Sequence, residues 1–359
     1  MKEDSEINDI RSAKNFKDIS FSKFKKVDVK KELLNSLINS KIEPTCYWSA
    51  ELICAGHYMD LWEVIIIFYT KHVHLGNTKI AIYIELRLNQ FREICNFGYI
   101  NNELNMRNNL KIRHLFCEVM CILCDAKRKH SFDNTKIHKN DFDMTQLRDK
   151  FKASSNTFAQ DVFKEGDPKE LFPAINEIAY NISEEGKNIM NACYWIEWII
   201  EFETICKNKK EQLLCERRNF KKVETKLQMD IIWIIWDLFF VEAGKRSKII
   251  KKIMDSLFTM FTFKYTKCCS KKRKNILYFA ISILCENITN DEEIMRTSQK
   301  EIVQNILKKV DLIYAQIKKN EESTGTEYLF KDVKSFNLEK TIAKLETMNT
   351  FGETFMPRI

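Results

Sequence analysis

The stretch YWIEWIIEFETICKNKKEQLLCERR, residues 194–218, changes character halfway along its length. Its first nine residues are almost wholly apolar and aromatic, and its second half is dense in lysine, arginine and glutamate. A helix that spans a bilayer needs about 20 apolar residues, whereas this run is shorter and is interrupted by Glu197, Glu201 and Glu203. The pattern therefore predicts a core helix that continues into a charged surface, and no membrane anchor.

Glycine and proline are too sparse for a sheet protein or for the common phosphate-binding loops. The 359 residues include 8 Gly and 4 Pro, whereas sheets need frequent Gly, Pro and Asn-Gly turns. Dinucleotide-binding loops, P-loops and the G-x-S-x-G turn of hydrolases need closely spaced glycines, so that backbone N–H groups can approach the bound group. The composition therefore predicts an all-α chain and excludes these classes of site.

A repeated aromatic motif bears on how the helices pack. W-x-x-W-x-x-x-F occurs at residues 195–202 and again at 233–240, an offset of 38 residues that is close to the length of a helix-pair repeat. We therefore expect an elongated helical array in two parts, for which HEAT-like stacked helix pairs are one interpretation. Two core helices that face one another are the other interpretation.

Changes in polarity along the chain indicate where helices and domains begin and end. Asp167, Pro168 and Glu170 resemble a helix start with a capping box. Helices are expected to follow at about 170–182, 184–207, 210–222, 226–243, 246–263 and 272–287, and a longer one begins at Asn290. The expected segments are a polar N-terminal arm (1–30), an N-terminal helical domain (31–126), a polar linker or insertion (127–165), a C-terminal helical domain with a basic edge (166–320) and a C-terminal amphipathic tail (321–359).

The segment from Lys207 to Lys274 carries most of the excess positive charge. It contains 19 Lys and Arg against 7 Asp and Glu, while the whole chain has a net charge of +8. The charges form clusters at or near the ends of apolar helices, so they can gather on one edge and attract phosphates. Ordinary solvated helix ends are the alternative interpretation. The expected nucleic-acid-binding residues are Lys207, Lys209, Lys210, Arg217, Arg218, Lys221, Lys222, Lys245, Arg246, Lys248, Lys251, Lys252, Lys271, Lys272, Arg273 and Lys274.

The 12 cysteines are expected to be reduced and mostly to fill the core, because the N-terminus shows no secretory signal. His114, Cys117, Cys121 and Cys124 fall on one face of one helix, at i, i+3, i+7 and i+10. Ligands spread along one helix in this way cannot surround one ion, and a zinc site needs a second, distant pair. We therefore expect no metal, no cofactor and no structural disulfide.

Two short patterns point to alternative functions. Glu197 and Glu201, at i and i+4, together with Asp237 could form the carboxylate site of an enzyme with an unfamiliar helical active site. No histidine is placed to complete such a site, so we expect Glu197 and Glu201 on a solvated face and no catalytic residue. The stretch YWSAELI, residues 47–53, fits the Y-x-x-x-x-L-Φ peptide by which translation-initiation scaffolds engage a cap-binding protein, although Trp48 and Leu52 also fit a core helix.

Large apolar side chains recur beyond the polar stretch EESTGTE, residues 321–327. The segment that follows is too short for a core of its own. It either packs back onto the helices of the chain or docks in a groove of a protein partner, and docking is the expectation. The expected partner-binding residues are Tyr328, Phe330, Leu338, Ile342, Leu345, Phe351 and Phe355.

Four stretches carry a family resemblance: YWSAELICAGHYMDLWE, NACYWIEWIIEFE, KKRKNILYFAI and YLFKDVKSFNLEKTIAKLETMNTFGETF. Together they resemble an uncharacterised protein family of nucleocytoplasmic large DNA viruses, the giant viruses of protists and algae. The resemblance covers about residues 20–359 and implies a viral setting without site residues. We therefore expect a non-enzymatic scaffold or adaptor in viral replication, gene expression or assembly, with an edge that binds nucleic acid or another polyanion. The expected location is the host cytoplasm or viral factory, with the virion as an alternative, and the oligomeric state is open.

Overall fold

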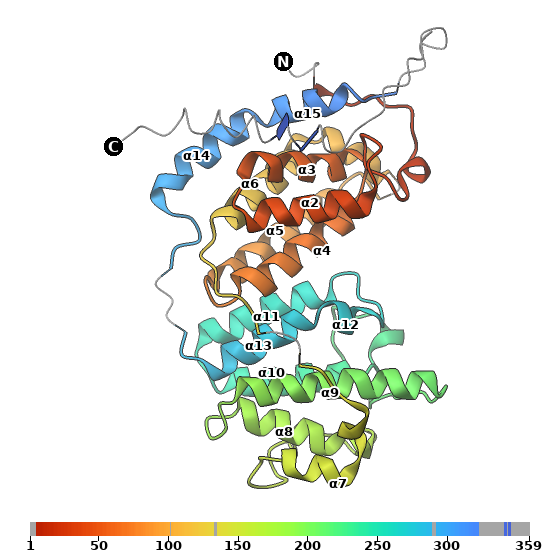
Figure 1. Cartoon of the computed structure of the whole chain (residues 1–359), viewed down its shortest axis with the longest axis vertical. Coiled ribbons are helices and arrows are strands. Elements are labelled where there is room, and N and C mark those ends of the chain that lie inside the picture. The colour runs from red at the N-terminus through yellow and green to blue at the C-terminus, as the bar shows by residue number, and fades with distance from the viewer. Residues whose placement is uncertain are drawn as a thin grey trace. The chain divides into compact units, whose positions relative to one another are not determined.

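A computed structural model describes residues 5–100, 102–132, 135–288 and 292–322, together with 341–342 and 344–345. These residues form helices joined by turns and irregular segments, and they contain isolated β-bridges but no strand (Figure 1). The predicted all-α class is confirmed. The chain separates into two compact units. Unit 1 comprises residues 1–69, 86–127 and 293–359, and unit 2 comprises residues 70–85 and 128–292.

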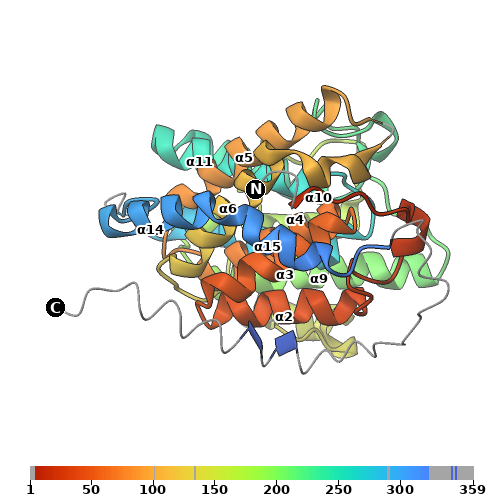
Figure 2. The same cartoon turned by 90° about the horizontal axis from the view of Figure 1, so that it is seen from above.

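Unit 1 is built around α3 (Ile42–Cys54), a helix that is buried on every side. Every residue from Pro44 to Cys54 is buried, as expected for a helix with apolar neighbours all round. Helices α2, α4, α6 and α15 pack against it, and Figure 2 shows α15 crossing over α3. The elements of unit 1 are η1 (Ala13–Phe16), α2 (Lys26–Ile38), α3, α4 (Tyr58–Phe68), the part of α5 (Lys79–Asn96) from Leu86 onward, η3 (Glu103–Asn108), α6 (Leu110–Asp125), α14 (Thr297–Lys308) and α15 (Val310–Lys318).

Unit 2 is built in the same way around α13 (Lys274–Cys285). Every residue from Ile276 to Leu284 is buried, and α8, α9, α10 and α11 all pack against this one helix. A bundle around a central helix gives no support to HEAT-like repetition, in which each helix pair contacts only its neighbours. The other elements of unit 2 are the π-turn η2 (Tyr69–Val73, counted from Thr70), η4 (Lys139–Phe142), α7 (Met144–Leu147), η5 (Arg148–Lys150), η6 (Lys169–Leu171), α8 (Phe172–Ile182), α9 (Ile189–Asn208), η7 (Thr225–Leu227), α10 (Ile232–Gly244), α11 (Lys248–Thr262) and α12 (Cys269–Lys272).

Helix α9 is the one predicted from the stretch at 194–218. Its first part buries Trp195 and Trp198, and it ends at Asn208 among exposed lysines. Lys210 adopts a positive φ of 64°, and the N–H of Glu211 donates to the carbonyl of Cys206 at 2.9 Å, so a left-handed turn ends the helix. The predicted core helix that continues into a charged surface is confirmed. Among the residues that the structure describes, no helix is both long enough and apolar enough to cross a membrane.

Two predicted helices differ from the structure. Residues 209–231 contain no α-helix, although one was predicted at 210–222. The N–H of Cys215 instead donates to the carbonyl of Met229 at 2.9 Å, so this part of the chain pairs with the segment that leads into α10. The long helix predicted before Lys319 is divided into α14 and α15 at Lys309, whose φ of −102° and ψ of 2° interrupt the helical geometry.

The segment predicted as a polar linker, residues 127–165, belongs to unit 2 from Arg128 onward. Its aromatic side chains lie on α9: the rings of Phe142 and Trp198 are 5.2 Å apart, and those of Phe151 and Trp195 are 5.5 Å apart. A few well-placed aromatic residues therefore bind an otherwise polar segment to the core. The two units therefore divide the chain at other points than the predicted domains, and residues 293–320 belong to unit 1.

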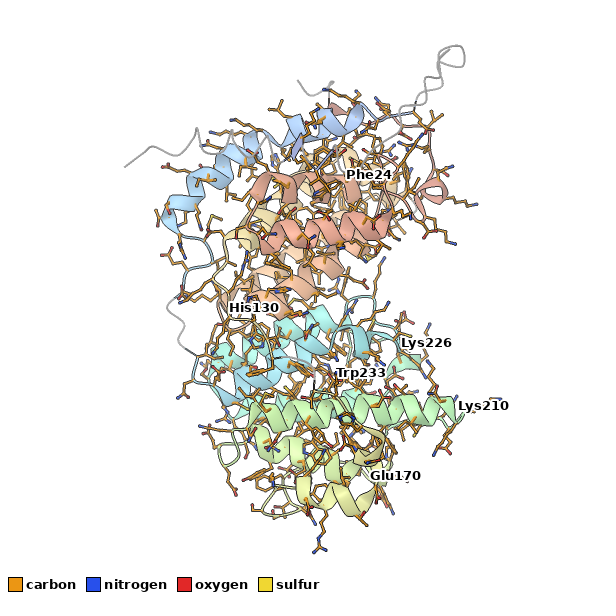
Figure 3. The ribbon with its side chains drawn as sticks, in the orientation of Figure 1. Phe24, His130, Glu170, Lys210, Lys226 and Trp233 are labelled. Atoms are coloured by element: carbon orange, nitrogen blue, oxygen red, sulfur yellow. The ribbon has the colours of Figure 1, made fainter. Side chains whose placement is uncertain are left out.

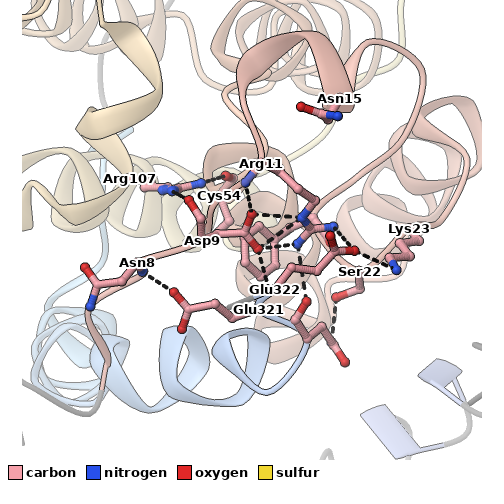
Figure 4. A network of polar contacts seen from close by, with 12 residues as sticks. Asn8, Asp9, Arg11, Asn15, Ser22, Lys23, Cys54, Arg107, Glu321 and Glu322 are labelled. Atoms are coloured by element: carbon pink, nitrogen blue, oxygen red, sulfur yellow. Dashed lines mark hydrogen bonds and ion pairs between the residues drawn. The ribbon is translucent and has the colours of Figure 1, made fainter. Parts of the chain in front are cut away.

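The predicted N-terminal arm, residues 1–30, is packed into unit 1 over its described part (Figure 4). Arg11 and Asp9 form a buried ion pair, in which Nη2 and Oδ2 are 2.6 Å apart. The N–H of Glu322 donates to Oδ2 of Asp9 at 2.9 Å, and Arg107 donates to the carbonyl of Asp9 at 3.2 Å. The pair therefore joins the N-terminal arm to the end of the segment 292–322. The buried apolar residues of the arm are Ile7, Phe16, Phe21, Phe24 and Val29.

We expect Asp9→Asn to lower the free energy of unfolding by about 3–5 kcal/mol, because the substitution leaves the Arg11 guanidinium buried without its counter-charge. Lys23→Gln is the matched control, since Lys23 pairs with Glu322 at 2.7 Å but the two side chains are 50% and 40% exposed. Loss of an exposed pair should cost less than about 1 kcal/mol. Urea denaturation followed by tryptophan fluorescence measures both, and equal effects would contradict the structural role of Asp9.

Candidate nucleic-acid interface

The first group of cations surrounds the end of α9 and the irregular segment 209–231 that follows it. Lys207, Lys209 and Lys210 are exposed at the C-terminus of α9, where the helix dipole favours positive charge. Figure 3 shows Lys210 at the tip of the helix, directed away from the bundle. These three residues are therefore available to an anionic partner and also stabilise their own helix end.

Arg218 anchors the irregular segment inside unit 2. Its side chain is 2% exposed and donates to both carboxylate oxygens of Asp167, with Nη2 2.6 Å from Oδ2. Its Nε lies 2.8 Å from Oδ2 of Asp237 on α10. A buried, bidentate pair of this kind determines orientation as well as position. Asp167 is thus not the helix cap that was predicted, because it also accepts the N–H groups of Lys164 and Glu216, each at 2.9 Å.

The pKa values of this anchor follow from burial and pairing. Burial raises the pKa of Asp167, but hydrogen bonds from Arg218 and from backbone N–H groups outweigh it and hold the pKa below its ordinary value. Burial also raises the pKa of Asp237, and there the contact with Arg218 does not reverse the shift. Burial lowers the pKa of Arg218, yet the hydrogen bonds with Asp167 and Asp237 raise it overall. Asp167 is therefore the principal counter-charge of Arg218.

The second group of cations follows α11 and includes α12. Arg273 is buried and donates to the carbonyl oxygens of Phe261 and Phe263 at 2.7 and 2.8 Å, so it satisfies acceptors where α11 ends. Lys271 and Lys272 are exposed on α12. The turn between α11 and α13 is thus held from inside by an arginine and presents lysines outward.

Several contacts bring the two groups to one end of the α10–α11 hairpin. Nζ of Lys222 lies 2.5 Å from the hydroxyl oxygen of Thr259, near the end of α11. The rings of Trp233, at the start of α10, and Tyr265 are 4.7 Å apart, and Lys267 lies 3.7 Å from Asp230. We call the exposed cations at this end the basic surface: Lys207, Lys209, Lys210, Arg217, Lys221, Lys222, Lys226, Lys264, Lys267, Lys271 and Lys272. The exposed carboxylates in the same segments are Glu211, Glu216 and Glu224.

The third predicted cluster lies at the other end of the same hairpin. Lys245–Ser247 connect α10 to α11, and α11 has 15 residues, so the start of α11 is about 22 Å from its end. The clusters at 207–222 and 271–272 therefore meet at one end of the hairpin, and the cluster at 245–252 begins at the other. Lys252 is seven residues, or about 10 Å along α11, from Thr259. The exposed cations of this third cluster are Lys245, Lys248, Lys251 and Lys252.

Four predicted binding residues are corrected, because each is engaged inside unit 2. Arg218 and Arg273 are buried as described above. Arg246 is half-buried and pairs with Glu242 at 2.9 Å and with Glu184. Lys274 is mostly buried and lies 2.6 Å from Glu197. The fold adds Lys226, Lys264 and Lys267 to the basic surface. They were not among the predicted binding residues, although they lie in the same Lys-rich stretches of the sequence.

Glu197 and Asp237, two carboxylates of the alternative enzyme site, bind different side chains. Glu197 is 8% exposed, which corrects its predicted place on a solvated face, and it accepts hydrogen bonds from Lys274 and from the hydroxyl of Tyr278. Asp237 instead pairs with Arg218. Each of these two carboxylates is thus satisfied by a structural partner of its own.

The YWSAELI stretch lies inside α3 and is not presented to a partner. Tyr47, Trp48 and Leu52 are 5%, 2% and 0% exposed. A helical peptide that engages a cap-binding protein must offer its tyrosine and leucine on the surface. The structure therefore assigns this stretch to the core of unit 1.

Two of the predicted partner-binding residues lie against unit 1. Ile342 and Leu345 line a cavity of about 210 Å³ together with residues of α2 and α3, among them Pro44 and Trp48. Leu345 is 3% exposed. This part of the tail therefore packs on the chain itself. Tyr328, Phe330, Leu338, Phe351 and Phe355 lie outside the described residues.

The cysteines of α6 have a neighbour that their spacing did not reveal. Cys46 of α3 lies 3.7 Å from Cys117 and 4.0 Å from Cys121, measured between sulfur atoms. Cys124 donates to the hydroxyl of Thr45 at 3.3 Å, and His114 is only half-buried. None of the 12 cysteines forms a disulfide.

Comparisons with known protein families, with curated proteins and with solved structures found no match to this chain. The viral resemblance therefore stays a prediction.

Asp167→Asn should lower the free energy of unfolding by about 3–5 kcal/mol at neutral pH, since it leaves Arg218 without its principal counter-charge. The pKa of Asp167 is lower in the folded chain than its unfolded value of about 3.9, so its stabilising contribution is complete above that value and is lost as the pH falls through the folded pKa. The difference between variant and wild type should therefore shrink below about pH 4. A difference that stays constant down to pH 3 would contradict this role, and Glu224→Gln, in an exposed pair with Lys226, is the control.

Leu345→Ala should lower the free energy of unfolding by about 2–3 kcal/mol, because it removes a buried side chain from the cavity beside Trp48. Leu312→Ala on α15 is the control, since Leu312 is 61% exposed and its loss should have little effect. Thermal denaturation compares the two. An unchanged melting temperature for Leu345→Ala would favour the alternative in which the tail docks on a partner.

Proposed function

We propose that the protein binds nucleic acid through the basic surface of unit 2 and acts as a non-enzymatic scaffold or adaptor. The observation that carries the proposal is the convergence of two segments distant in sequence, 207–226 and 264–272, at one end of the α10–α11 hairpin. Eleven cations but only three carboxylates of these segments are exposed there. A concentration of positive charge of this kind attracts a phosphate backbone and releases its counterions.

The side chains of the basic surface suit phosphate contacts more than base recognition. Ten of its eleven cations are lysines, which act as hydrated point charges, whereas arginine forks are preferred for bidentate contacts to bases. Lys209, Lys271 and Lys272 form no ion pair with any residue that the structure describes. We therefore expect binding with little sequence preference and a steep dependence on salt.

The proposed setting follows from the resemblance to giant-virus proteins. A protein that binds nucleic acid without sequence preference fits viral replication, gene expression or assembly, in the host cytoplasm or viral factory. In this setting the tail residues Tyr328, Phe330 and Phe355 are candidates for contact with a protein partner.

Charge reversal at the basic surface tests the proposal. The triple variant Lys209→Glu, Lys271→Glu and Lys272→Glu should bind labelled RNA and duplex DNA at least about 10-fold more weakly at low salt, and its salt slope should fall by about one for each phosphate that is no longer neutralised. Fluorescence anisotropy over a series of salt concentrations measures both quantities. Wild-type dissociation constants weaker than micromolar for both nucleic acids at low salt would overturn the proposal.

The chain offers a control of equal charge at the other end of the hairpin. Lys248→Glu, Lys251→Glu and Lys252→Glu also reverse three exposed lysines of unit 2, so the net charge of the two triple variants is identical. We expect the control to weaken binding much less. Equal reductions in affinity in the two variants would show that net charge, and not the basic surface, determines the affinity.

A further inference from the structure

Three buried thiols from two helices converge in unit 1. Cys117 and Cys121 are one turn apart on α6 and face α3, which carries Cys46. The sulfur of Cys46 lies 3.7 Å from that of Cys117 and 4.0 Å from that of Cys121, and all three lie within 4.8 Å of one another. Cys46, Cys117 and Cys121 are 4%, 4% and 2% exposed. Among the described residues, this is the cluster whose ligand atoms are placed to hold a metal ion.

The separations between the sulfur atoms agree with coordination of one ion. A metal about 2.3 Å from each sulfur requires sulfur–sulfur distances of about 3.8 Å in a tetrahedral site and about 4.0 Å in a trigonal one. Two of the observed distances, 3.7 and 4.0 Å, lie in this range already. A disulfide needs a sulfur–sulfur bond of about 2.05 Å, which is much shorter than these separations.

Sulfur is also the donor atom that soft metals prefer. Thiolate sulfur is the form that binds them, so each thiol gives up its proton when its bond to the metal forms.

We propose that Cys46, Cys117 and Cys121 form a binding site for a single Cu(I) ion. Soft sulfur ligands select Cu(I), Zn(II) and iron–sulfur clusters. A structural zinc site takes four ligands, and iron–sulfur clusters are held by four cysteines, whereas the converging atoms are three. Three sulfur ligands satisfy Cu(I), which accepts trigonal coordination. On binding, sulfur–metal bonds replace the S–H bonds, and the displaced protons leave to the solvent.

An ion at this position would cross-link α6 to α3, the central helix of unit 1. It binds the folded state and not the unfolded one, so it raises the stability of unit 1 with increasing metal concentration. Helix α15 packs on both α3 and α6, and α14, which precedes it, buries only Val303.

Anaerobic titration of the reduced full chain with Cu(I), in competition with the chelator bathocuproine disulfonate, tests the site. We expect one tightly bound Cu(I) per chain, an increase in melting temperature, and X-ray absorption that reports three sulfur neighbours at about 2.3 Å. Removal of a group that hydrogen-bonds to a metal ligand lowers metal affinity about 10–100-fold. Removal of a ligand itself should cost more, so we expect Cys46→Ala, Cys117→Ala and Cys121→Ala each to lower the affinity for Cu(I) at least about 100-fold. Circular dichroism confirms that each variant is folded.

Two further variants are the matched controls. Cys54→Ala removes another buried thiol of α3, and Cys124→Ala removes the next cysteine of the same face of α6, and both should keep wild-type affinity. A fourth sulfur neighbour together with loss of binding in Cys124→Ala, or tighter retention of Zn(II) than of Cu(I), would overturn the assignment to Cu(I). Copper retained in all three ligand variants, or no copper retained by the wild type, would overturn the site itself.

Discussion

The ion pair between Arg218 and Asp167 is the interaction on which the arrangement of unit 2 around its basic surface depends. The pair is buried, and the same guanidinium also contacts Asp237 on α10 and the carbonyl of Val162. One side chain thus joins the irregular segment after α9 to a helix and to the loop before α8. Because both charges are buried, removal of either partner leaves the other unsatisfied, so the segment has one strongly preferred position. The exposed lysines on it are held in place by this arginine beneath them.

Buried arginines have the same role in unit 1. Arg11 pairs with Asp9, and Arg113 lies 2.9 Å from Asp311 and 4.0 Å from the centre of the Tyr314 ring. In both units a helix without a polar face forms the centre, and the irregular segments around it carry polar backbone groups that need partners. Arginine satisfies several carbonyl and carboxylate groups at once through its planar fork, whereas lysine remains hydrated and exposed. Most of the cations that hold the fold are therefore arginines and most of the exposed ones are lysines, with Lys274 and Arg217 as the exceptions.

The helices that could be predicted are those whose apolar residues recur with helical spacing. α8, α11 and α13 agree with expectation to within a few residues, because their burial follows from local periodicity. The segment at 210–222 also has a helical composition, yet it forms no helix, because Arg218 is bonded to Asp167, about fifty positions earlier in the chain. The predicted linker or insertion at 127–165 is attached to α9 through single aromatic rings, which carry no periodic signal, so its packing could not be read from the sequence.

The sequence by itself determined the all-α class, the core helix that runs into a charged end, and the region in which positive charge is concentrated. These follow from composition and from periodicity over one helix, which are local properties of the chain. Only the tertiary structure decided which cations are exposed, since Arg217 and Arg218 are adjacent in sequence but one is exposed and the other is 2% exposed. It also brought Cys46 to Cys117 and Cys121 from 71 and 75 positions away. Burial and metal coordination depend on neighbours in space, and packing of separate helices sets those neighbours.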